Sequence, residues 1–243
     1  MLSQKTYLLR ASHFFTMKKI VLLTALIFCL QLFAQSPGGV ATSLHTWWKA
    51  DAGVTGATPV TNWNDQSGNS YNFTSPNGPD FQSVDNNYNP SLSFDGSGDY
   101  LVVTNGLFGT TTFSEMFTFI VNKSTGISAS FIFYEALAGG DRFGSHITWS
   151  NQNVYYDLGT CCGASRINTN WGSAVNINHI WTLTASTSTA TPSGTRKAIY
   201  RDGLRIRTSN SNDTGTGNNN NFYLGSFSPT QRFHPGDISE VIM

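Results

Sequence analysis

The chain has 243 residues, a length that corresponds to one large domain or two small ones. Only 12% of the residues are charged, about half the share that is usual in soluble globular proteins, and basic and acidic side chains number 14 each. This composition excludes a coiled coil, a charged helical bundle and a highly charged disordered chain. Because the net charge is zero, no basic surface predicts binding to nucleic acid.

The first 34 residues have the pattern of a secretory signal peptide. Lys18 and Lys19 precede an apolar run from Ile20 to Ala34, and the sequence Gln35-Ser36-Pro37 ends it. We therefore predict a signal peptide over residues 1–34, with Met17 as the expected true start, and a mature domain over residues 35–243. The alternative is an uncleaved anchor. No other segment reaches about 18 apolar residues, so we predict a secreted or cell-surface protein without a stable membrane span after signal removal.

Export also bears on the cysteines and on charge. Four basic residues lie in the signal segment (Lys5, Arg10, Lys18 and Lys19), so the exported domain has ten basic and 14 acidic side chains. Cys161 and Cys162 are adjacent and reach an oxidising compartment. They can form a vicinal disulfide, pair with other chains, or stay free.

The mature chain has the periodicity of short strands. Runs rich in aromatic and β-branched residues alternate with clusters of Gly, Asn, Asp, Ser and Pro, and no segment has the pattern of an ordinary amphipathic helix. We predict an all-β fold, a two-sheet antiparallel jelly-roll sandwich. The predicted strands are 44–49, 91–94, 100–104, 117–122, 130–134, 146–149, 154–158, 180–186, 196–201, 222–226 and 238–243.

Two local patterns support the sandwich. Asp202-Gly203 stands between two apolar runs, which is a strong signal for a β-hairpin turn. Large apolar side chains recur at positions that can fill the layer between two sheets. The predicted members of this core are Trp48, Trp63, Phe94, Phe119, Trp181 and Leu224.

Several motifs resemble the laminin-G-like jelly-roll domains of the concanavalin A-like lectin/glucanase superfamily, particularly those of secreted Bacteroidetes proteins. The motifs are Trp47-Trp48-Lys49-Ala50-Asp51-Ala52-Gly53, Trp63-Asn64-Asp65-Gln66-Ser67-Gly68-Asn69, Leu92-Ser93-Phe94-Asp95-Gly96, Asp99-Tyr100-Leu101, Trp181-Thr182-Leu183-Thr184, Ile199-Tyr200-Arg201-Asp202-Gly203, Phe222-Tyr223-Leu224-Gly225-Ser226 and Gly236-Asp237-Ile238-Ser239-Glu240-Val241-Ile242. The resemblance implies this fold over nearly all of residues 38–243. The last strand of the family normally continues further, so we expect the sequence to be truncated at Met243 and to belong to a larger protein.

The sequence gives little support for catalysis. Glycoside hydrolases need two carboxylates facing each other across the bond, and the glucanases of this superfamily carry them in a Glu-x-Asp-x-x-Glu pattern. The three glutamates, Glu115, Glu135 and Glu240, do not stand in that pattern. The chain also lacks the G-x-S-x-G and H-E-x-x-H motifs. We therefore do not expect an enzyme, and a glycoside hydrolase is the least favoured functional hypothesis.

A glycan or cell-surface polymer is the predicted partner. Sugars are bound by aromatic rings that stack on their C–H faces and by amide or carboxylate groups that bond to their hydroxyls. The stretch from Trp149 to Trp171 is rich in both kinds of side chain. The candidate ligand-binding residues are Trp149, Asn151, Asn153, Tyr155, Tyr156, Asp157, Arg166 and Trp171. The alternative is that the asparagines only form turns and that Arg166 is an edge charge.

Calcium is a second candidate ligand, because many laminin-G-like domains carry such a site. Calcium takes six to eight oxygen ligands. Asp65, Asp95, Asp99 and Asp237 stand near predicted turns and are the candidate ligands, although none has the spacing of a twelve-residue calcium loop.

Two functional classes remain open. One is a secreted, non-catalytic carbohydrate-binding or adhesion module of a larger surface protein. The other is a structural spacer that holds neighbouring domains apart. An exposed row of aromatic rings on one face distinguishes the first from the second.

Overall fold

The computed structural model describes residues 36–40, 42–172, 175–190 and 194–243. The predicted signal peptide, residues 1–34, lies outside this range. By its contacts the chain divides into residues 1–42 and a compact domain, Ser43–Met243. In the first unit the described residues contain one 3₁₀ turn, η1 (Pro37–Gly39). Within the described ranges no helix is both long and apolar enough to cross a membrane.

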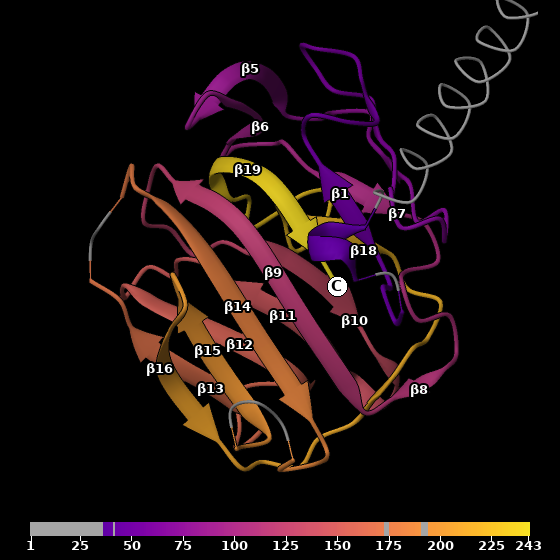
Figure 1. Cartoon of the computed structure of the whole chain (residues 1–243), viewed down its shortest axis with the longest axis vertical. Helices are drawn as coiled ribbons and strands as arrows, with labels where there is room; N and C mark the ends of the chain where they lie inside the picture. Colours follow the sequence, from indigo (N-terminus) through magenta and orange to yellow (C-terminus); the bar gives the residue numbers. More distant parts are fainter. Residues whose placement is uncertain (1–35, 41, 173–174, 191–193) are drawn as a thin grey trace, which may run out of the picture. The chain divides into compact units, whose positions relative to one another are not determined.

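The domain is a sandwich of two antiparallel sheets, which confirms the predicted fold class (Figure 1). In spatial order the first sheet contains β16 (Leu204–Ser209), β15 (Lys197–Arg201), β14 (Asn178–Ser186), β9 (Glu115–Ser124), β19 (Pro235–Ile242), β6 (Asn89–Asp95) and β5 (Asp80–Asn86), with β1 (Trp47–Lys49) also paired to β19.

The second sheet contains β13 (Arg166–Asn170), β12 (Asn153–Thr160), β11 (Asp141–His146), β10 (Phe133–Ala136), β18 (Phe222–Leu224), β7 (Leu101–Val103), β4 (Phe73–Thr74), β3 (Asn62–Trp63) and β2 (Val54–Thr55). A small third sheet joins β17 (Gly215–Thr216) and β8 (Thr112–Phe113), and a 3₁₀ turn, η2 (Ala138–Gly140), links β10 to β11. Several neighbouring strands in the large sheets are far apart in sequence, as β19 beside β9 and β6 shows.

Most of the predicted strands coincide with observed ones, with shifted ends. The strand predicted at residues 146–149 is wrong: β11 ends at His146, and Trp149 accepts a backbone hydrogen bond from Gln152 in the following turn. The two-residue strands β2, β3, β4, β8 and β17 have no periodicity to reveal them, because two residues cannot show an alternation.

The predicted hairpin is confirmed. Arg201 pairs with Leu204, so Asp202 and Gly203 form a two-residue turn between β15 and β16. Both turn residues have positive φ, 52° and 79°, as a type I′ turn requires. The side chain of Asp202 also accepts a hydrogen bond from the Ile180 amide at 2.9 Å, which attaches the turn to β14.

The core lies between the two large sheets and is built on aromatic rings. Of the six predicted core residues, five are buried: Trp48, Trp63, Phe94, Trp181 and Leu224. Phe119 is a correction, because its side chain is 38% exposed. In β9 the inward positions are Met116, Thr118 and Ile120, and alternation therefore places Phe119 on the outer face.

Trp48 occupies the centre of this core. Its ring lies 4.5 Å from that of Phe73 and 6.1 Å from that of Phe222, so one residue of the first sheet contacts two rings of the second. Its indole N–H donates to the Tyr71 carbonyl at 2.8 Å, which satisfies the polar atom of a fully buried side chain.

A buried lysine connects the sheets at another point. The Lys197 side chain is 1% exposed, and its ammonium donates to the Leu158 carbonyl at 2.7 Å and to Asp213 at 2.6 Å. Burial lowers the pKa of Lys197, and the neighbouring carboxylate of Asp213 opposes that shift. The cation is tolerated there because the Leu158 carbonyl of the second sheet, the Ser165 carbonyl before β13 and the Asp213 carboxylate surround it.

Truncating the central indole tests the core. Trp48→Ala removes the ring contacts and leaves the Tyr71 carbonyl without its donor, so we expect a loss of about 3–5 kcal/mol in the free energy of unfolding. Val84→Ala is the control, since Val84 is 66% exposed and its truncation is expected to change stability by less than about 0.5 kcal/mol. Urea unfolding of both variants measures the difference. Equal stabilities would contradict the placement of Trp48 in the core.

Candidate functional site

The candidate site lies on the outer face of the second sheet, over β10 to β13. The strand register places one residue from each of these four strands in a single row, on the same face of the sheet. The row consists of Tyr134, Gly144, Asp157 and Arg166. The neighbouring positions Phe133 and Tyr156 point the other way and are fully buried in the core. The glycine at position 144 allows two rings to pack over the sheet: a Cβ atom there would lie 3.2 Å from the Phe133 carbonyl oxygen and 3.4 Å from the rings of Phe131 and Tyr134.

A carboxylate shared by two arginines fixes this face. Asp157 accepts from Arg166 Nε at 2.7 Å and Nη2 at 2.9 Å, and from Arg142 Nη2 at 2.7 Å and Nε at 3.0 Å. The Asp157 side chain is 0% exposed, and those of Arg142 and Arg166 are 11% and 17% exposed. Since both carboxylate oxygens are engaged, the buried charge is paired and hydrogen-bonded, as its burial requires.

A buried histidine extends this cluster. His146 Nδ1 lies 2.7 Å from the Ser130 carbonyl, and its Nε2 lies 3.2 Å from Arg166 Nη2. Because a carbonyl only accepts, the proton belongs on Nδ1, and Nε2 accepts from the guanidinium. Burial lowers the pKa of His146 to about 3, so the ring is neutral beside the two arginines.

Aromatic rings surround the cluster. The Arg166 guanidinium lies 4.4 Å from the centre of the Tyr155 ring, and Arg232 lies 5.0 Å from that of Trp149. The Tyr155 hydroxyl accepts from the side-chain amides of Asn151 at 2.7 Å and Asn153 at 3.3 Å. Trp149 and Tyr155 are each partly exposed, so their rings are held in place and still reach solvent.

Five of the eight predicted ligand-binding residues come together here: Trp149, Asn151, Asn153, Tyr155 and Arg166. Ligand binding by them stays a prediction. The other three predicted residues are corrections, because their side chains are buried. Tyr156 is in the core, Trp171 is 7% exposed and packs on Trp181 at 5.6 Å, and Asp157 is covered by its arginines. Adjacent residues of a strand cannot share a face, so Tyr155 outside requires Tyr156 inside.

Sequence reasoning missed other members of the same face. Tyr134 and Phe227 are partly exposed, with ring centres 4.3 Å apart, and Phe131 lies beneath them at 2% exposure. Arg142 and the exposed Arg232 were also missed. Alternation along residues 133–136 could have placed Tyr134 outside, but nothing local indicates that Phe227 meets it or that Arg232 meets Trp149. We call the partly or fully exposed side chains Tyr134, Asn151, Trp149, Tyr155, Phe227 and Arg232 the aromatic face.

Cys161 and Cys162 are joined by a disulfide in the turn after β12, which is one of the alternatives left open by the sequence. Arg142 Nη2 lies 3.7 Å from Cys162 Sγ. The turn therefore borders the arginine cluster.

The four aspartates predicted as calcium ligands do not form one site. Asp65 accepts from the amides of Trp47, Ser67 and Tyr71 and so organises a turn. Asp237 pairs with Lys123 at 2.7 Å. In the described part of the chain, no group of three or more His, Cys, Asp or Glu residues has an arrangement that could hold a metal ion.

Asp95 and Asp99 do lie together, in the turn after β6. Asp99 accepts from the Asp95 amide at 2.9 Å, and Asp95 accepts from the Ser97 amide at 2.7 Å. Burial, together with the charges of Asp95 and Asp80, raises the pKa of Asp99 to about 6. The two carboxylates thus serve the backbone of their turn.

The three glutamates are engaged separately. Glu115 accepts from Ser186 Oγ at 2.7 Å, and Glu240 accepts from the Trp47 indole at 2.7 Å. Glu135 is fully buried and accepts from the Leu107 amide at 2.9 Å. Each carboxylate thus has a separate structural partner, and none of these contacts assembles a pair across a cleft as glycoside hydrolysis requires.

Solved structures share this fold at low sequence identity. Domain 4 of AbnA, an extracellular GH43 arabinanase of Geobacillus stearothermophilus in complex with arabinotriose, matches with a TM-score of 0.56 and 13% identity, over 82% of this chain and 90% of that one. The binding domain of botulinum neurotoxin serotype G matches with a TM-score of 0.56 and 12% identity, over 82% of this chain and 47% of that one.

A third match is the sialidase of Trypanosoma rangeli, with a TM-score of 0.50 and 15% identity over 86% of this chain. The present chain spans 32% of the length of that sialidase. No family model and no curated protein matches the sequence. These likenesses establish the class of the fold, an all-β sandwich of two antiparallel sheets, at identities that carry no assignment of activity.

Asp157→Asn tests the role of the buried carboxylate. The substitution leaves two largely buried guanidinium groups with no counter-charge, so we expect a loss of about 3–5 kcal/mol in unfolding free energy. Asp51→Asn is the matched control, because the Asp51 side chain is 58% exposed and pairs with Lys49 at 3.6 Å, and a loss below about 1 kcal/mol is expected. Thermal or urea unfolding gives both values. A loss at Asp157 no larger than that of the control would contradict the cluster.

Proposed function

We propose that this chain is a secreted, non-catalytic glycan-binding module of the laminin-G-like kind, part of a larger exported or cell-surface protein. The observation that carries the proposal is the aromatic face. It presents the partly exposed rings of Tyr134 and Tyr155 on the second sheet beside four side chains of the adjoining turns, Trp149, Asn151, Phe227 and Arg232.

The chemistry of this face suits a sugar. Aromatic rings offer flat apolar surfaces for the C–H faces of a pyranose or furanose, and their conformational freedom is small. Asn151 and Arg232 supply hydrogen bonds to hydroxyl groups beside the rings. The Asp157 cluster holds Tyr155 and Arg166 in place before any ligand arrives, which reduces the entropy lost on binding.

Two further observations support the proposal. The pattern of residues 1–34 is typical of the signal peptide of an exported protein. A domain with the same fold, domain 4 of AbnA, was solved with arabinotriose and belongs to an extracellular enzyme. We extend from that domain only the idea that a sandwich of this class can bind an oligosaccharide.

The test is binding of the purified chain to insoluble polysaccharides and to a glycan array. We expect retention of at least one polymer. Trp149→Ala is expected to weaken binding about 30-fold or more, because truncating an aromatic anchor typically removes about 2 kcal/mol or more. Phe119→Ala is the control: it removes a partly exposed ring of the first sheet and is expected to leave binding unchanged.

Three results would overturn the proposal. Retention of no glycan by the wild-type chain would favour the spacer. Loss of binding in Phe119→Ala with full binding in Trp149→Ala would move the site to the other sheet. Release of reducing sugar from a bound polymer would make the module an enzyme.

A further inference from the structure

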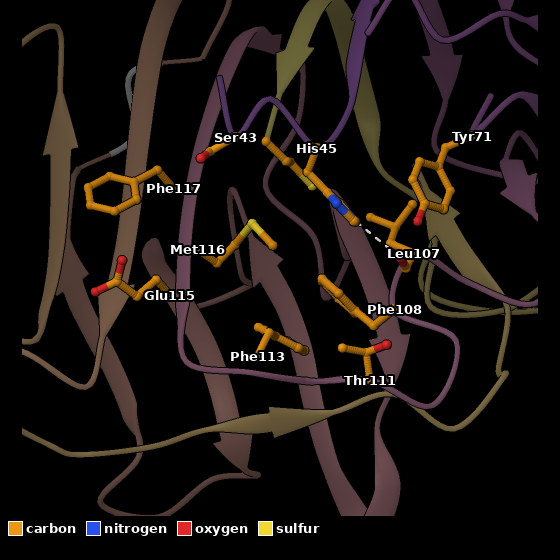
Figure 2. Close-up of a pocket in the computed structure, with 11 residues that line it drawn as sticks. Ser43, His45, Tyr71, Leu107, Phe108, Thr111, Phe113, Glu115, Met116 and Phe117 are labelled. Atoms are coloured by element: carbon orange, nitrogen blue, oxygen red, sulfur yellow. Dashed lines mark hydrogen bonds between the residues drawn. The ribbon is translucent and has the colours of Figure 1, made fainter. Parts of the chain in front are cut away.

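A cavity of about 500 Å³ is lined by residues that do not belong to the aromatic face. Its walls come from the 43–45 segment, Tyr71, the 107–113 segment and the start of β9, with Met243 beside them (Figure 2). Proteins usually bind drug-sized molecules in cavities of about 300–1,000 Å³ with mainly apolar walls and a few fixed polar groups. This cavity has that size and that kind of lining.

His45 supplies the fixed polar group. Its Nε2 lies 3.0 Å from the Leu107 carbonyl oxygen, shown as the dashed line in Figure 2. Its ring is nearly parallel to that of Phe108, with centres 5.5 Å apart, and lies 4.9 Å from that of Tyr71. The imidazole is therefore held by one hydrogen bond and two rings.

The protonation of His45 follows from these contacts. Burial lowers its pKa, so the imidazole is neutral at neutral pH. Because the Leu107 carbonyl can only accept, the single proton is on Nε2, and Nδ1 is left as a hydrogen-bond acceptor. A ligand that uses His45 must therefore donate a hydrogen bond.

The apolar walls are flat and firmly supported. Phe108 stacks on Phe113 at 3.9 Å, and Leu107 and Met116 complete the apolar lining. Behind the wall, the Leu107 amide donates to the buried carboxyl group of Glu135 at 2.9 Å, and burial raises the pKa of Glu135 to about 8. The preceding Gly106 has φ +69°, and a Cβ atom there would lie 2.3 Å from the Asn220 carbonyl oxygen, so only glycine fits at this position beside Glu135.

The charge of the lining disfavours an anionic ligand. Glu115 is the acidic residue among the lining residues, and there is no lysine or arginine among them. An anion would face the Glu115 carboxylate without a counter-charge. Burial, with the charges of Asp65 and Glu135, raises the pKa of Tyr71, so its phenol stays protonated and neutral. The hydroxyls of Tyr71 and Thr111 can complete the hydrogen bonds of a hydroxyl group.

We propose that this cavity is a second ligand site, independent of the glycan face, and that it binds a small neutral aromatic alcohol. The ring of the ligand packs against Phe108, Phe113 and Met116, and its hydroxyl donates to His45 Nδ1.

The test uses three naphthalene probes of similar size and ligand-detected NMR on the purified chain. We expect 2-naphthol to bind, 2-methoxynaphthalene to bind about ten-fold more weakly because it lacks the donor, and 2-naphthalenesulfonate to bind more weakly still. His45→Phe keeps a ring at this position and removes the acceptor, so we expect about a ten-fold loss for 2-naphthol and little change for 2-methoxynaphthalene.

Thr111→Trp is the second variant, because Thr111 is an exposed lining residue and its replacement leaves the core untouched. We expect it to reduce the binding of both uncharged probes by filling the cavity. Trp149→Ala is the control and is expected to bind 2-naphthol as the wild type does. Equal binding of 2-naphthol and 2-methoxynaphthalene, unchanged binding in Thr111→Trp, or loss in Trp149→Ala would overturn the proposal. Each of these results is independent of glycan retention.

Discussion

The alternation of side chains across paired strands is the constraint on which both the core and the candidate site depend. In β12, Tyr155 and Tyr156 are neighbours of the same type, yet one lies under an arginine on the outer face and the other is fully buried. In β10 the same alternation buries Phe133 and leaves its neighbour Tyr134 on the outer face. A shift of one residue in register would place the buried rings in water and the polar ones in the core, so a large penalty fixes the pairing.

The buried carboxylate of Asp157 is the second determinant of the outer face. Burying a charge costs free energy, and the four hydrogen bonds from Arg142 and Arg166 offset that cost. The result is an ordered surface in which the Arg166 guanidinium is fixed over the ring of Tyr155. The sandwich therefore provides an ordered platform on the second sheet, whereas Phe119 and Ile180 are the exposed apolar side chains of β9 and β14 on the first sheet.

The sequence was sufficient for the fold class, for most strands, for the Asp202-Gly203 hairpin and for five of six core residues, because these features are encoded over short stretches. It placed Phe119 wrongly because aromatic content alone does not give the phase of a strand. The role of Asp157 could not be predicted, since it depends on Arg142 in a neighbouring strand and on the exact pairing of β11 with β12. The cavity could not be predicted from the sequence either, because the contact between His45 and Leu107 joins residues 62 positions apart.

The placement of the neighbouring residues Tyr155 and Tyr156 on opposite faces of the sheet can be measured directly. In a chain with labelled tyrosine rings, a soluble paramagnetic agent broadens the NMR signals of rings that reach solvent. The account predicts strong broadening for Tyr134 and Tyr155 and little for Tyr156, which is 0% exposed. Broadening of Tyr156 equal to or greater than that of Tyr155 would contradict the register and the aromatic face that it creates.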